Sequence, residues 1–156
     1  LEGRLDDFRV GAGEVENLVA QVVHPLRADI GRGEAGMTGG QMAPTTMLEQ
    51  ETTTTPFGRD ARVNGYPLRM AELMAGLTGT TFVARCAVDT PKNLMRAKRY
   101  LRKAFEVQLE DRGFGFVEFL SACPTNWKMT PKQATEHVAR TMIPYYPLGV
   151  FKEEKA

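Results

Sequence analysis

Apolar residues recur at three- and four-residue spacing through residues 91–112, which is the pattern of a helix with one buried face. The residues that set this spacing are Leu94, Ala97, Leu101, Ala104, Phe105 and Leu109. Gly113 follows where a helix commonly stops. The same kind of spacing predicts a short helix over residues 67–77 and another over residues 131–142, which Pro144 should end.

Two runs rich in β-branched and apolar residues, 80–88 and 114–121, flank the long helix and predict buried strands. A strand, a long helix and a second strand form a parallel crossover unit, which requires a sheet with helices on both faces. The predicted fold class is therefore α/β with a parallel sheet. Ligands of such sheets bind beyond the carboxyl ends of the strands, which directs attention to residues 36–56 and to Cys123.

Residues 36–60 contain glycine pairs, prolines and a run of four threonines, with neither helical nor strand periodicity. A loop of this length is uncommon inside a compact domain and tends to be functional or disordered. This loop is the first region in which we expect a site.

Composition fits one ordinary globular domain, since the 156 residues are 42% hydrophobic and 25% charged with a net charge of +1. No apolar run approaches the roughly 18 residues of a membrane-spanning helix and no secretory pattern opens the chain, so we expect a cytoplasmic protein without a membrane partner. The first 34 residues carry a net charge of −3 and the remainder +4. Within the acidic stretch, residues 15–23 fit either a short helix or a buried strand.

Three further patterns have ordinary explanations. Residues 31–36 match the spacing of a dinucleotide fingerprint, but no strand precedes them and no helix can follow. The basic residues of 92–103 could attract phosphates or an acidic partner, although a solvated helix face is the simpler interpretation. Aromatic platforms are missing, so we expect no nucleic-acid partner. His24 and His137 show no local signature of a nucleophilic pair.

The two cysteines, Cys86 and Cys123, lack the close spacing of a self-contained zinc or iron–sulfur site. Cys123 fits either a small core residue or a ligand presented at the end of the second strand. The residues alone leave both alternatives open.

Two motifs nevertheless carry a specific resemblance. Residues 36–46 read Gly-Met-Thr-Gly-Gly-Gln-Met-Ala-Pro-Thr-Thr, and residues 52–60 read Thr-Thr-Thr-Thr-Pro-Phe-Gly-Arg-Asp. Together they closely resemble the thiamine diphosphate loop in the beta subunit of 2-oxoacid:ferredoxin oxidoreductases, in the branch that acts on 2-oxoglutarate or branched-chain 2-oxoacids. Similar segments follow in the family's order at residues 82–85, 103–108, 113–120, 121–127 and 142–151, so the resemblance covers residues 36–152.

The resemblance implies oxidative decarboxylation of a 2-oxoacid to an acyl-coenzyme A, with thiamine diphosphate and magnesium, a 4Fe–4S cluster, an alpha subunit and ferredoxin as cofactors and partners. A Gly-Gly turn with exposed N–H groups beside threonine hydroxyls suits a diphosphate. The cofactor-binding residues implied are Gly36, Met37, Thr38, Gly39, Gly40, Gln41, Thr45 and Thr46.

Most departures from the family pattern concern metal ligands, and Ala35 stands where the family has a tyrosine. The chain has no Gly-Asp-Gly, and Gly31 and Arg32 stand where the family has an asparagine pair. By this alignment Glu34 offers magnesium only a backbone carbonyl, and Cys123 resembles a cluster ligand whose Cys-x-x-Cys partners are absent.

We therefore expect three parts: residues 1–35, unrelated to the family pattern and by hypothesis encoded out of frame or joined from elsewhere; residues 36–152, the carboxyl-terminal part of a thiamine diphosphate-binding domain; and residues 153–156, a charged tail. Catalytic residues stay unknown at this stage. The alternative function is a non-catalytic fragment or subunit-association domain.

Overall fold

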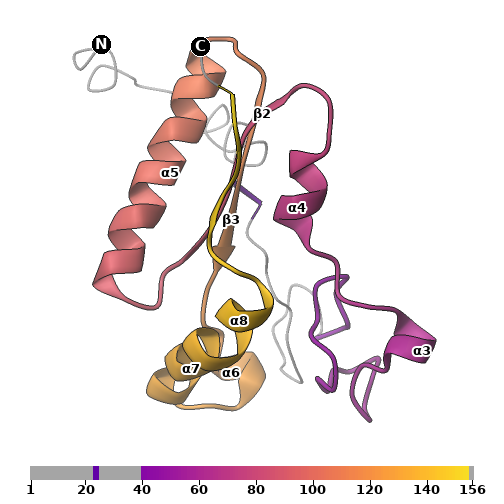
Figure 1. Cartoon of the computed structure of the whole chain (residues 1–156). Coiled ribbons are helices and arrows are strands. Elements are labelled where there is room, and N and C mark those ends of the chain that lie inside the picture. The colour runs from indigo at the N-terminus through magenta and orange to yellow at the C-terminus, as the bar shows by residue number, and fades with distance from the viewer. Residues whose placement is uncertain (1–22, 25–39, 155–156) are drawn as a thin grey trace.

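The structure is a computed structural model that describes residues 23–24 and 40–154. Its elements surround one small sheet (Figure 1). In chain order they are β1 (Val23–His24), α3 (Ala61–Asn64), α4 (Met70–Ala75), β2 (Thr80–Ala87), α5 (Pro91–Leu109), β3 (Phe114–Leu120), α6 (Pro124–Trp127), α7 (Pro131–His137), the π-helix η1 (Val138–Met142), α8 (Ile143–Tyr145) and β4 (Gly149–Glu153).

The sheet has the order β1-β3-β2-β4, and both β1 and β2 run parallel to β3. Because α5 connects β2 to β3, the predicted crossover unit and the α/β class are confirmed. β4 instead runs antiparallel to β2, so the sheet is mixed rather than wholly parallel. β4 also includes Glu153, the first residue of the expected charged tail.

Each face of the sheet is covered by a different helix, and Figure 1 shows α5 and α4 on opposite sides of the strands. Alternate residues of β2 explain this arrangement, because successive side chains of a strand point to opposite faces. Phe82, Ala84 and Cys86 pack with the small residues of α5, whereas Val83 packs with Ala71 of α4. Every residue of β2 is buried, as predicted for a doubly covered strand.

A third cluster closes the carboxyl end of the parallel strands. Ala87 and Leu120, the last residues of β2 and β3, pack with Val138, Met142 and Tyr146. The predicted helix does not stop before Pro144, because the amide of Ile143 reaches back five residues to the carbonyl of Val138. This wider turn allows the chain to continue helically past a proline, which has no N–H to donate.

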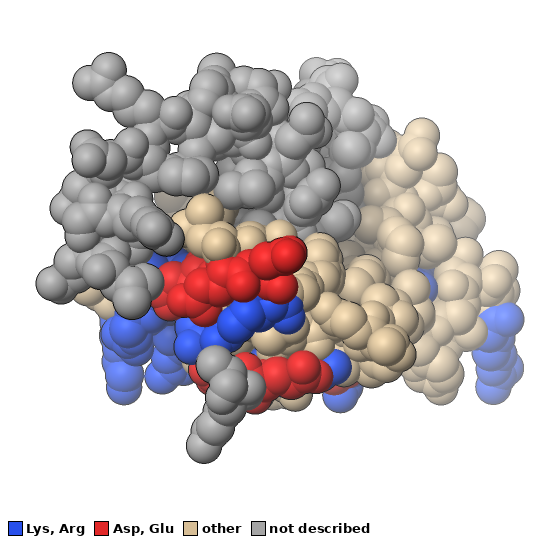
Figure 2. All heavy atoms as spheres, turned by 90° about the horizontal axis from the view of Figure 1, so that it is seen from above, with Lys and Arg blue, Asp and Glu red and all other residues tan. Residues whose placement is uncertain are grey.

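Charges at the opposite end of the molecule are paired rather than gathered by sign. Figure 2 views the end where α5 and β4 finish and shows acidic and basic side chains next to one another. Lys103 of α5 lies 3.3 Å from Glu153 of β4. The basic face of α5 is thus partly neutralised here. No helix in the described part of the chain is long and apolar enough to cross a membrane.

The side of the sheet that faces α4 contains a buried charge network around Arg85. Arg85 of β2 stands opposite Glu118 of β3 in the ladder, and both side chains are fully buried. Arg85 Nε donates to Glu118 Oε2 at 2.7 Å, and its two terminal nitrogens donate to the carboxylate of Glu72 on α4. Glu118 Oε2 also accepts the N–H of Ala71 at 3.2 Å. One guanidinium therefore fastens α4 to both central strands.

The carboxyl-terminal segment is held by the same cation. Arg85 Nη1 donates to the carbonyl of Pro147 at 3.1 Å. The guanidinium carbon lies 5.2 Å from the ring centroid of Tyr146 and 4.9 Å from that of Phe151, within the range of cation–π contacts. The turn that leads into β4 is thereby tied to the sheet.

One cation between two carboxylates leaves an imbalance of charge, and the two acids respond in opposite directions. Burial raises the pKa of Glu118, although Arg85 and the Ala71 amide oppose this rise. Burial would also raise the pKa of Glu72, but the hydrogen bond and charge of Arg85 bring it below its usual value. Within the described residues, Glu118 Oε1 has no hydrogen-bond partner. Arg85 thus stabilises the charged form of Glu72 more effectively than that of the more deeply buried Glu118.

We predict that Arg85→Met lowers the free energy of unfolding by about 3–5 kcal/mol, because it leaves two carboxylates without their cation. Glu118→Gln should cost only about 1 kcal/mol, since an amide oxygen still accepts from Arg85 and Ala71. Urea unfolding measures both.

The control variant is Lys103→Met, which breaks the exposed Lys103–Glu153 pair and should change stability by less than about 1 kcal/mol. An Arg85→Met protein as stable as the control would show that the buried network does not hold the fold.

Candidate functional site

The threonine run of the predicted site loop is folded on its own hydroxyl groups. Thr52 Oγ1 lies 2.7 Å from Thr55 Oγ1 and accepts the Thr55 amide at 3.0 Å. Thr54 Oγ1 accepts the amide of Met42 at 2.9 Å, and the Thr53 amide donates to the carbonyl of Gly40 at 2.9 Å. Hydroxyl side chains that bond nearby backbone replace the regular ladder that this segment lacks. The two recognised motifs are therefore joined to each other.

Arg59 organises the same loop from inside. It is 5% exposed, and its three guanidinium nitrogens donate to backbone carbonyls at 2.7–3.3 Å. The acceptors are the carbonyls of Ala43, Pro44, Thr46, Asn64, Gly65 and Tyr66. A guanidinium carries five donors in a fixed plane, so one side chain can satisfy many carbonyls that a loop would otherwise bury unpaired.

A close backbone approach completes the loop at Gly58. The amide of Glu49 donates to the carbonyl of Arg59 at 2.9 Å, and the amide of Arg59 donates to the backbone carbonyl of Gln50 at 3.0 Å. Gly58 has φ +91°, and a Cβ there would lie 2.8 Å from the Glu49 carbonyl oxygen. Only glycine fits this position without displacement of the backbone.

The loop is attached to the carboxyl-terminal segment through Tyr146. Its phenol donates to the carbonyl of Thr45 at 2.7 Å, and the ring is fully buried. Burial raises the pKa of Tyr146, so the phenol keeps its proton and remains a donor. Because Tyr146 also packs against Arg85, the loop is connected to the buried charge network.

Some of the predicted cofactor-binding residues lie within the described structure. Gly40 is buried and Gln41 exposed at the start of the loop. Thr45 and Thr46 are 5% and 0% exposed. The Thr46 hydroxyl accepts the Ala43 amide at 2.8 Å, so it already has a structural role. The predicted residues Glu34, Gly36, Met37, Thr38 and Gly39, the Gly31–Gly36 fingerprint and the atypical residues 1–22 lie outside the described residues.

Cys123 and Cys86 occupy different environments. Cys123 is half-buried at the amino end of α6, three residues after the carboxyl end of β3. Cys86 lies in the core against α5, and burial raises the pKa of its thiol to about 12. The described residues contain no group of three or more His, Cys, Asp or Glu that could hold a metal ion.

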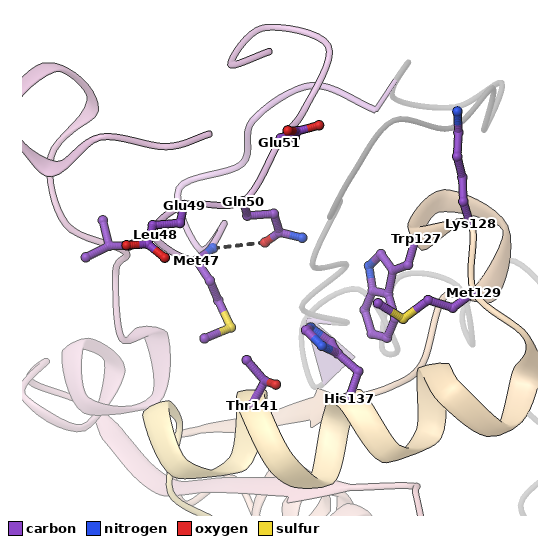
Figure 3. A pocket seen from close by; sticks show the side chains of 10 residues that line it. All are labelled: Met47, Leu48, Glu49, Gln50, Glu51, Trp127, Lys128, Met129, His137 and Thr141. Atoms are coloured by element: carbon purple, nitrogen blue, oxygen red, sulfur yellow. Dashed lines mark hydrogen bonds between the residues drawn. The ribbon is translucent and has the colours of Figure 1, made fainter. Parts of the chain in front are cut away.

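A pocket of about 410 Å³ opens beside the loop, between the turn after Met47 and the helices α6 and α7 (Figure 3). Its residues are Met47, Leu48, Glu49, Gln50, Glu51, Trp127, Lys128, Met129, His137 and Thr141. The rings of Trp127 and His137 meet edge to face at 4.9 Å, and burial lowers the pKa of His137. His137 therefore lines this pocket, which its position on a helix did not predict.

Two polar groups of the pocket have distinct roles. Gln50 Oε1 accepts the Met47 amide at 3.1 Å, which fixes the turn that forms one wall (Figure 3). The indole nitrogen of Trp127 is buried and has no hydrogen-bond partner in the described structure. Such an unpaired donor costs about 1–3 kcal/mol and marks a place where the fold is not optimised for stability alone.

We predict that Gly58→Ala lowers the free energy of unfolding by about 1–3 kcal/mol, because the added Cβ must displace the Glu49 carbonyl and adopt an unfavourable φ. Gly79→Ala is the matched control. Gly79 has φ +83° in the turn closed by the Thr80 amide and the Leu77 carbonyl, and no atom lies within 4 Å of an added Cβ, so it should cost about 1 kcal/mol from strain alone. Equal losses in urea unfolding would contradict the close approach.

The chain is similar to several curated proteins. Ketoisovalerate oxidoreductase subunit VorA of Methanothermobacter thermautotrophicus is 42% identical over 121 residues, which is 78% of this chain and 25% of that subunit. 2-Oxoglutarate synthase subunit KorB of Archaeoglobus fulgidus is 33% identical over 129 residues, 76% of this chain and 44% of that subunit. Pyruvate synthase subunit PorB of Pyrococcus furiosus is 28% identical over 106 residues, 68% of this chain and 30% of that subunit.

No family model and no solved structure matches the chain. The chain spans about a quarter of the length of the ketoisovalerate oxidoreductase subunits and less than half of the 2-oxoglutarate synthase subunit. The matches nevertheless include the proteins that the sequence motifs resemble, at up to 42% identity. The chain therefore belongs to the family of 2-oxoacid:ferredoxin oxidoreductase subunits.

Proposed function

We propose that residues 36–152 are the carboxyl-terminal part of the thiamine diphosphate-binding domain in the beta subunit of a 2-oxoacid:ferredoxin oxidoreductase. The complex would decarboxylate a 2-oxoacid oxidatively, transfer the acyl group to coenzyme A and pass the released electrons to ferredoxin. The observation that carries this proposal is the loop of residues 40–60, where both family motifs fold into one unit around Arg59 beyond the sheet. An alpha subunit would complete the complex.

The relatives support a branched-chain 2-oxoacid as substrate. Identity is 41–42% with subunits named for ketoisovalerate, against 33–36% and 25–28% with subunits named for 2-oxoglutarate and pyruvate synthesis. This ranking favours branched-chain 2-oxoacids within the family. It assigns no residue of the chain to substrate contact.

The described residues do not fit a complete magnesium site. Magnesium requires oxygen ligands in octahedral arrangement. Thr46 uses its hydroxyl and its carbonyl within the loop, and the Thr45 carbonyl is taken by Tyr146. The part of the chain that the structure describes contains no group of three or more His, Cys, Asp or Glu side chains that could hold a metal ion. Thr45 and Thr46 would therefore support the cofactor loop rather than ligate its metal, and Gly40 and Gln41 would border the diphosphate.

Cys123 would serve a 4Fe–4S cluster in the same complex. Its half-buried position beyond β3 supports a ligand role, and one thiolate requires three more from elsewhere in the subunit. The chain's own contribution to electron transfer would be this single ligand.

The second candidate function is a non-catalytic fragment or subunit-association domain. The observation that favours it is the donor set, because Gly31 and Arg32 replace the family's asparagine pair and no Gly-Asp-Gly is present. This candidate keeps the family's fold and partner but loses its cofactor.

We predict that the isolated chain binds thiamine diphosphate with magnesium weakly or not at all, since the diphosphate loop lacks its metal ligands. Isothermal titration calorimetry should show no saturable heat at micromolar concentrations. Binding with micromolar affinity would show that the ligand argument is wrong.

An activity assay separates the two candidate functions. The chain is mixed with its alpha subunit, thiamine diphosphate, magnesium, coenzyme A and a 2-oxoacid, and the reduction of a viologen dye is followed. Cofactor-dependent reduction supports the catalytic subunit, and its absence despite complex formation supports the association domain.

A further inference from the structure

The segment from Thr55 to Tyr66 carries large apolar side chains that the fold leaves uncovered. Phe57 is 100% exposed, Val63 80% and Tyr66 71%. Scattered apolar residues are normal on a protein surface, but three within ten residues on one short segment form a group. We refer to residues 55–66 as the projection, because Figure 1 shows α3 standing away from the sheet.

The projection is rigid despite its exposure. The Gly58 amide donates to the Thr55 carbonyl at 3.0 Å, which closes a turn with Phe57 at its tip. Asp60 caps α3 by accepting the Arg62 amide at 2.7 Å. Arg59 holds the far side of the projection through the carbonyls of Asn64, Gly65 and Tyr66. The three apolar side chains are thus presented on a fixed backbone rather than on a loose loop.

Rigid exposed aromatic residues are the usual anchors of protein interfaces. Interface anchors are enriched in aromatic residues and arginine, and a fixed backbone lowers the entropy lost on binding. The projection fits this composition, since it has Phe57, Tyr66 and the exposed Arg62 and contains no lysine or glutamate. A membrane surface or nucleic acid would instead favour clustered lysine and arginine.

The relatives and the charge of the projection indicate which partner binds it. The ketoisovalerate oxidoreductase, 2-oxoglutarate synthase and pyruvate synthase relatives are each named as one subunit of an enzyme, which favours another subunit as the partner. Arg62, next in sequence to Val63, is exposed on the projection. A partner surface that suits the projection therefore has an apolar pocket bordered by carboxylates.

We propose that the projection is the docking element for the alpha subunit, with Phe57 inserted into an apolar pocket of that subunit. This assignment rests on the proposed function, which supplies the partner. Phe57 makes no packing contact that the fold needs, because its ring is fully exposed. Its substitution therefore changes docking and leaves the folded chain intact.

The experiment measures binding of the chain to the immobilised alpha subunit by biolayer interferometry. Phe57→Ser should weaken binding at least tenfold, and Phe57→Leu should weaken it less because the apolar contact is partly kept. The control is Leu109→Ser on α5, which also replaces an exposed apolar side chain, 50% exposed, and should leave binding unchanged. Urea unfolding should give the same midpoint for Phe57→Ser and the wild-type chain.

Three results would overturn the assignment. Equal affinity of Phe57→Ser and wild type would move the interface elsewhere while the proposed function stands. Self-association of the chain in sedimentation, lost in Phe57→Ser, would make a second copy the occupant. Absence of any complex between wild-type chain and alpha subunit would contradict the docking element together with the partner named in the proposed function.

Discussion

The guanidinium of Arg85 lies on the side of the sheet that faces α4, with no exposed surface of its own, and a buried cation of this kind must be paired in several directions at once. Glu118 pairs with the guanidinium across the β2–β3 ladder, and Glu72 pairs with it from α4. The Pro147 carbonyl accepts a further hydrogen bond from it. The two central strands, α4 and the carboxyl-terminal segment can therefore adopt only one relative arrangement. An apolar residue at this position could fill the space, but it would leave this arrangement undetermined.

The site loop depends indirectly, through Tyr146, on the arrangement of the strands around Arg85. Tyr146 packs its ring on Arg85 and donates a hydrogen bond from its phenol to the Thr45 carbonyl, so the position of the first family motif follows from the position of the sheet. Arg59 holds the loop together as Arg85 holds the sheet together, by donating several hydrogen bonds from one buried guanidinium. Its acceptors are backbone carbonyls, whereas those of Arg85 are mainly carboxylates. The two arginines explain how a segment without regular secondary structure keeps a defined shape beyond the carboxyl ends of the strands.

Much of the sheet could be predicted because its elements follow a simple period. The long helix ends at Leu109 instead of residue 112, and β2 and β3 each end one residue earlier than predicted. β4 was missed because a half-exposed edge strand has only a weak apolar pattern, and the helix that passes Pro144 was missed because a π turn leaves no mark in the period. The pairing of Arg85 with Glu118 was not predicted, because contact between positions 33 residues apart is not visible in sequence. Thr45 and Thr46 were expected at the site from the motif, whereas the pocket around Trp127 and His137 brings together segments that only the fold makes neighbours.

Hydrogen–deuterium exchange of Tyr146→Phe tests the link between the charge network and the site loop most directly. The substitution removes one hydroxyl and keeps the ring on Arg85, so a hydrogen bond of about 1 kcal/mol is lost without a cavity. The account predicts that amides bonded within the loop, such as those of Thr46, Glu49 and Arg59, exchange several-fold faster while the amides of β2 and β3 keep their protection. Unchanged exchange in the loop, or an equal loss of protection in the strands, would contradict the claim that the sheet positions the site through Tyr146.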